Sequence, residues 1–183
     1  MTTRKTISRV LAAFAVAGVA TAATALAAGT ASAAPASTVQ PCTSNQFTTT
    51  LVDGGAGAGN HYGAVQFTAN QGERCYLPGN LAVDLVGAHN VLVNNTAAAD
   101  APSVALVDGS SAYVPLHWTE IESYDQQQTP NAVSVVAPSD SNQHGDYLNP
   151  NITVDWNLGV VDASADNHTI DVGAVTQGLA PTV

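Results

Sequence analysis

The chain has 183 residues, with 14 acidic side chains against four basic ones and a formal net charge of −10. Three of the four bases, Arg4, Lys5 and Arg9, lie at the N-terminus, so Arg74 is the only base in the rest of the chain. A surface this acidic neither neutralises a phosphate backbone nor attracts an anionic membrane. We therefore expect no nucleic-acid partner. Cationic ligands are compatible with this charge.

The N-terminal segment has the features of a signal peptide. Its positive start is followed by the apolar, Ala-rich run Val10–Ala28 and by the small-residue pattern Ala31-Ser32-Ala33. We expect a signal helix over residues 1–33, cleaved after Ala33. An uncleaved membrane anchor is the weaker alternative, because the run is short and ends in a cleavage site. The sequence predicts a secreted protein without a membrane partner after cleavage, extracellular or loosely associated with the cell wall.

Two cysteines, Cys42 and Cys75, follow the signal segment. In an exported chain a single pair predicts one disulfide. A redox-active pair is disfavoured because the CxxC spacing is missing. We expect a flexible tether over residues 34–41, one domain over 42–179 and a short tail over 180–183.

The first half of this domain consists of short β-branched or alternating runs separated by turn residues. Asp53–Asn60 is predicted to be a flexible Gly/Ala turn. The predicted strands are Phe47–Val52, His61–Ala69, Cys75–Leu77, Leu81–Leu85 and, at an edge, Val91–Val93.

In the second half, Asp108-Gly109 predicts a hairpin turn before the strand Ala112–Trp118. Pro115 favours an edge position or a bulge for that strand. His117 is expected to face solvent together with Tyr113. The remaining predicted strands are Val133–Val135, Ile152–Trp156 and Ile170–Val175, with a long polar loop from Pro138 to Pro150.

The pattern contains no amphipathic helix of useful length after the signal segment. It predicts an all-β fold, an antiparallel immunoglobulin-like β-sandwich of about eight or nine short strands. A true immunoglobulin domain is disfavoured, because the cysteines are too close together and no tryptophan lies between them.

The stretch AGAGNHYGAVQFTANQGERCYLPGN, residues 56–80, resembles the signature of the actinobacterial exported "domain of unknown function 4232" family. The resemblance continues through VALVDGSSAYVPLHW and ends near IDVGAV. It implies that Cys42 and Cys75 are the family's structural disulfide, and it carries no activity. The sequence departs from the family pattern at Asn60, Ala69 and Asn80.

Catalytic signals are weak throughout the sequence. It has no G-x-S-x-G elbow, and its five histidines are scattered without metal-ligand spacing. For His61 we expect a packing or hydrogen-bonding role at the start of its strand. We therefore expect no catalytic residue, no cofactor and no metal. The predicted function is a monomeric, non-enzymatic binding module with an unknown extracellular or envelope ligand.

The segment Asp162–Asp171 is the basis of an alternative function, the binding of a calcium ion. Asp162, Ser164 and Asp166 place oxygens at alternate positions, as at the start of a calcium loop. The pattern fails further on, where Asn167 replaces glycine and Gly173 replaces glutamate. A solvated acidic hairpin loop is therefore the preferred interpretation. A calcium-binding protein or metal-dependent enzyme that uses the acidic loops stays open, as does a passive surface protein.

Overall fold

The computed structural model describes residues 38–178, 180 and 182. The predicted signal peptide and residues 34–37 of the predicted tether lie outside these residues. In the described part of the chain, no helix is long and apolar enough to span a membrane.

Strands make up nearly all of the regular structure of the described residues. One 3-10 helix, η1 (Tyr124–Gln126), is the only helix among the described residues. The strands are β1 (Phe47–Gly57), β2 (Asn60–Ala69), β3 (Arg74–Leu77), β4 (Val83–Val86), β5 (Leu92–Asn95), β6 (Val104–Val107), β7 (Ser111–Thr119), β8 (Gln127–Gln128), β9 (Ala132–Val136), β10 (Asn151–Asp155), β11 (Val161–Asp162), β12 (Thr169–Val172) and β13 (Thr176–Gln177).

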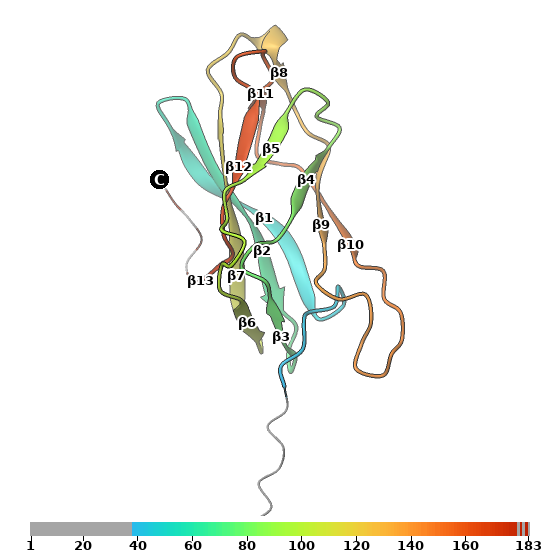
Figure 1. Cartoon of the computed structure of the whole chain (residues 1–183). Coiled ribbons are helices and arrows are strands. Elements are labelled where there is room, and N and C mark those ends of the chain that lie inside the picture. The colour runs from blue at the N-terminus through green and yellow to red at the C-terminus, as the bar shows by residue number, and fades with distance from the viewer. Residues whose placement is uncertain (1–37, 179, 181, 183) are drawn as a thin grey trace, which may run out of the picture. The chain divides into compact units, whose positions relative to one another are not determined.

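The strands form a β-sandwich, which confirms the predicted all-β class (Figure 1). The larger sheet runs β1-β2-β7-β12-β5, and β13 also pairs with β7. The second layer is the sheet β10-β9-β4, and two small ladders join β3 to β6 and β8 to β11. The thirteen strands exceed the predicted eight or nine chiefly because β8, β11 and β13 have two residues each. One pair, β5 with β12, is parallel rather than antiparallel.

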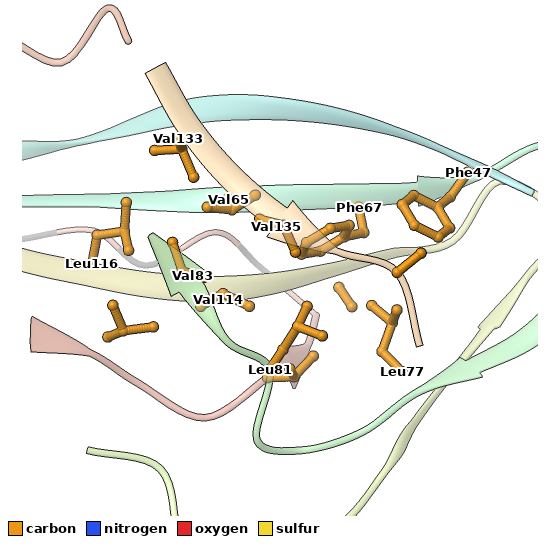
Figure 2. Close-up of a cluster of buried hydrophobic side chains, with 14 of the residues drawn as sticks. Phe47, Val65, Phe67, Leu77, Leu81, Val83, Val114, Leu116, Val133 and Val135 are labelled. Atoms are coloured by element: carbon orange, nitrogen blue, oxygen red, sulfur yellow. The ribbon is translucent and has the colours of Figure 1, made fainter. Parts of the chain in front are cut away.

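The core lies between the two layers (Figure 2). The larger sheet contributes Val65 and Phe67 of β2 and Val114 and Leu116 of β7. Every second residue of these strands points inward, because side chains alternate across a strand. The opposing layer contributes apolar residues that meet them: Val83, Val133 and Val135.

The glycine-rich stretch after Val52 is not the flexible turn that the sequence predicts. Strand β1 continues to Gly57 and stays paired with β2, with an irregularity between Asp53 and Gly55. Gly55 has a φ of 93°, a conformation that costs glycine little. The Asp53 carboxylate accepts a hydrogen bond from the Gly55 N–H at 2.8 Å. The glycines therefore form a bulge inside a longer hairpin.

The turn at Asp108-Gly109 is present, but it does not close a hairpin. Asp108 and Gly109 have φ values of 36° and 78°. However, β6 pairs with β3, whereas β7 pairs with β2. The turn therefore passes the chain from the small ladder into the larger sheet.

Pro115 lies in a central strand, not at an edge, because β7 is paired on both sides. The neighbouring chain is interrupted opposite Pro115, between β12 and β13. Gly173 lies in this interruption, and a Cβ there would lie 2.7 Å from the proline ring. Its N–H donates to the Pro115 carbonyl at 2.9 Å. The missing proline N–H is thus accommodated by a break in the partner chain, and not by the edge position or the bulge in its own strand that the sequence predicts.

Candidate functional site

The disulfide predicted from the sequence is present between Cys42 and Cys75, with a Cα–Cα distance of 4.8 Å. Both cysteines are fully buried. The Cys42 N–H donates to the Tyr76 carbonyl, and the Tyr76 N–H donates to the Gln40 carbonyl. Gln40 and Pro41, the end of the predicted flexible tether, are therefore paired alongside β3.

A groove of about 910 Å³ lies beside this disulfide. Residues 38–46 form one wall, residues 139–144 form the other, and Glu73 also lines it. The blue segment before β1 and the orange loop after β9 reach the same end of the domain in Figure 1. We call this feature the Cys42 groove. Nine of its twelve lining residues are Ser, Thr, Asn or Gln. It is therefore a polar, largely uncharged surface.

Backbone contacts hold the two walls of the groove together. The Ser139 N–H donates to the Cys42 carbonyl at 3.1 Å, and Thr43 forms a parallel bridge with Ser139. The Ser44 hydroxyl donates to the carbonyl of Asn149 at 2.8 Å. These contacts tie the chain on either side of the residue 139–144 wall to the residues next to the disulfide.

The opposite end of the domain, at β8 and β11, contains a buried carboxylate. Asp162 is 1% exposed. Its oxygens accept hydrogen bonds from the backbone N–H groups of Ile121 (3.0 Å) and Glu122 (3.1 Å). The side-chain amides of Gln127 (3.3 Å) and Asn167 (2.9 Å) also donate to it. Asp162 therefore fastens the loop after β7 to the segment after β11.

These donors determine the ionisation of Asp162. Burial alone raises the pKa of the carboxyl group, because desolvation penalises the charged form. Hydrogen bonds from Ile121, Thr119, Glu122 and Gln127 outweigh burial, so the pKa lies below its ordinary value. The carboxylate is therefore charged at neutral pH.

This position corrects the interpretation of Asp162 as part of a solvated acidic loop. Only the later residues, such as Asp166, are exposed. Both Asp162 oxygens face N–H donors, which a calcium ligand would have to give up. The Ser164 hydroxyl is also engaged, with the backbone of Asn167. Across residues 38–178, no three His, Cys, Asp or Glu side chains are grouped so that they could hold a metal ion.

His61 packs at the start of β2, as the sequence predicts. Its ring stacks on Trp118 with centroids 5.6 Å apart, and its Nε2 lies 2.9 Å from a carboxylate oxygen of Glu120. Trp118 in turn packs edge-on against Trp156, and its indole N–H donates to the carbonyl of Val160. These contacts join the start of β2 to the end of β7.

His117 differs from the prediction in part. Its side chain is partly exposed, but Nε2 lies 3.0 Å from the Asn60 amide oxygen and Nδ1 lies 3.7 Å from Asp171. Its ring also contacts Tyr62, with centroids 4.9 Å apart. Tyr113, which was expected to face solvent, is buried beside β13.

A second, smaller hollow of about 400 Å³ lies near Leu92 and is lined partly by His89 and His168. Nδ1 of His168 is buried and has no hydrogen-bond partner among the described residues. His89, by contrast, is exposed, and the hydroxyl of the lining residue Ser164 is already engaged with the Asn167 backbone. The Cys42 groove is larger and its walls are hydrogen-bonded to each other, so it is the better candidate site.

The comparisons with known proteins identify the family. Residues 42–176 match the family described as "Domain of unknown function (DUF4232)". The chain belongs to this family. No curated protein and no solved structure matches the chain.

The match to the DUF4232 domain begins at Cys42 and ends in β13, so it includes the disulfide, both layers and most of the Cys42 groove. Gly79, in the motif that carries the resemblance, has a structural role. A Cβ at this position would lie 2.4–2.5 Å from backbone atoms of Ala101 and Pro102. Such a contact cannot be relieved by a side-chain rotation. The motif thus specifies the fold, and the family name supplies no activity.

No sequence signal identified the groove. Its two walls, TSNQ at 43–46 and SDSNQH at 139–144, are rich in hydroxyl and amide side chains. Such runs are also typical of ordinary loops. Only the sheet arrangement brings them together, across almost 100 residues.

Proposed function

We propose that this DUF4232 domain is a secreted, non-enzymatic binding module of the extracellular space or cell envelope, with the Cys42 groove as its binding site. The observation that carries the proposal is a polar groove whose two walls are hydrogen-bonded to each other. Contacts between the walls of a site reduce the entropy cost of ordering them around a ligand. Loops at one end of a β-sandwich are also the usual place for recognition surfaces.

The charge of the protein restricts the ligand. Without residues 1–33, Arg74 alone balances 14 acidic residues, a net charge of about −13. Polyanionic envelope polymers are repelled by such a surface. We therefore propose a neutral or cationic envelope component as the ligand, and a monomeric protein that binds neither nucleic acid nor the lipid bilayer.

We expect protein purified after expression of the full chain to co-sediment with an envelope fraction of the producing organism. Ser141→Trp places a bulky side chain in the groove at an exposed position, and should reduce the bound fraction at least about tenfold. Gln71→Ala, an exposed substitution outside the groove, should leave it unchanged.

Equal co-sedimentation of Ser141→Trp and the parent protein would contradict the assignment of the groove. No co-sedimentation of either protein would favour a passive surface protein. Turnover of an ester, glycoside or peptide substrate that stops with chelator would favour the metal-dependent enzyme instead.

A further inference from the structure

We infer that the Cys42 groove binds a neutral oligosaccharide. This inference rests on the proposed binding function and specifies its ligand class. The inference follows from the chemistry of the lining, from the hydrogen bonds that fix several lining side chains, and from one exposed tyrosine that pairs with the lining residue Ser141.

The lining matches a ligand rich in hydroxyl groups. Each Asn or Gln amide both donates and accepts hydrogen bonds, and each Ser or Thr hydroxyl does the same. Sugar hydroxyls have the same double capacity, so these groups can satisfy one another. Pro41 is the only apolar lining residue, and no Lys or Arg lines the groove. The lining therefore suits neither an apolar ligand nor an anion.

Several polar groups of the groove are fixed by their neighbours. The Gln46 amide donates to a Glu73 carboxylate oxygen at 2.8 Å, and the Thr43 hydroxyl donates to the Asn45 and Gln46 amide oxygens. In the opposite wall, the Asn142 amide donates to Asp146 at 3.0 Å. Fixed donors and acceptors reduce the ordering cost of a polar ligand.

Other groups are free to receive a ligand. The Gln143 amide and the His144 ring line the groove, are exposed and have no side-chain hydrogen-bond partner within residues 38–178. Glu73 uses only one carboxylate oxygen in the described contacts. A carboxylate oxygen accepts strong hydrogen bonds from hydroxyl groups.

Tyr147 provides the aromatic face. It pairs with Ser141 in an antiparallel bridge and is 71% exposed. Tyr147 is not itself a lining residue, but this bridge places its backbone next to that of the groove-lining Ser141. An exposed tyrosine has an apolar face and a polar tip. This combination suits a pyranose ring, which has C–H groups on its face and hydroxyls at its edge.

Isothermal titration with maltohexaose, cellohexaose and fully N-acetylated chitohexaose, all three uncharged, tests the inference on protein purified after expression of the full chain. We expect at least one of the three to bind, and Gln143→Ala to weaken that binding about tenfold, as the loss of one or two hydrogen bonds would. Ser141→Leu, which fills the groove without adding an aromatic face, should abolish binding, whereas Gln71→Ala should not change it. A hexalysine peptide, titrated in parallel, represents a cationic ligand.

Binding of no sugar, binding that both groove variants retain, or binding of hexalysine alone would overturn the oligosaccharide class. If the sugars fail while groove-dependent co-sedimentation persists, only the ligand class is wrong. If co-sedimentation also fails, the proposed binding function is wrong as well.

Discussion

Replacing Cys42 and Cys75 together by alanine is expected to lower the free energy of unfolding by about 3–4 kcal/mol. The two cysteines are 33 residues apart in the sequence. A cross-link that closes such a loop lowers the conformational entropy of the unfolded chain. Removing the cross-link restores that entropy and so stabilises the unfolded state by roughly this amount. Urea denaturation of the parent protein and the double variant, analysed with a common two-state equation, measures the difference.

Single and chemical controls accompany the Cys42/Cys75 experiment. Each single alanine variant removes the same disulfide and should lose a similar amount, provided that the remaining thiol stays reduced. Reductant should act slowly on the native parent protein, because both cysteines are fully buried. A loss below about 1 kcal/mol in the double variant would show that the disulfide does not constrain the unfolded chain as described.

Replacing Asp162 by alanine is expected to lower the free energy of unfolding by about 2–4 kcal/mol. The change leaves the N–H groups of Ile121 and Glu122 and the amides of Gln127 and Asn167 without their acceptor. Hydrogen bonds to a charged group are worth about 1.5–3 kcal/mol each, and the cost of burying the charge offsets part of the sum. Amide hydrogen exchange should show faster exchange at Ile121 and Glu122.

We expect the contribution of the Asp162 carboxylate to the free energy of unfolding to depend on pH. Because the pKa of Asp162 is lower in the folded protein, its contribution is fully present above the unfolded pKa, about 4. The contribution is lost as the pH falls through the folded pKa. The stability gap between the parent protein and Asp162→Ala should therefore narrow below about pH 4. Asp166→Ala, at an exposed position, should change stability by less than about 0.5 kcal/mol. A gap of equal size at pH 7 and at pH 3 would contradict the assignment.

The sequence was sufficient to predict the strands whose side chains alternate. In β2 and β7 alternate apolar residues, such as Val65 with Phe67 and Val114 with Leu116, are buried in the core. These strands are long, and each has one face against the opposing layer, so periodicity alone locates them. The disulfide could be predicted from the expected export of the chain and from its two cysteines.

Long-range pairing could not be predicted in the same way. The parallel pair β5–β12 and the ladder β3–β6 join segments whose own sequences do not specify a partner. Asp162 is a similar case. Its position in GVVDASADNH resembles an exposed loop, and the donors that satisfy the buried carboxylate come from residues 121–127 as well as from Asn167. The Cys42 groove likewise depends on two loops that only the folded domain brings together.

The central claim is that this domain binds its ligand in the Cys42 groove. The most direct measurement is a ¹H–¹⁵N NMR titration of the labelled protein with a solubilised, neutral fraction of the producing organism's envelope. We predict chemical-shift changes at the amides of residues 40, 42–46, 73 and 139–144, and none at Ile121 or Glu122 at the opposite end of the domain. Changes confined to the Asp162 end, or no changes at any concentration of the fraction, would contradict the claim.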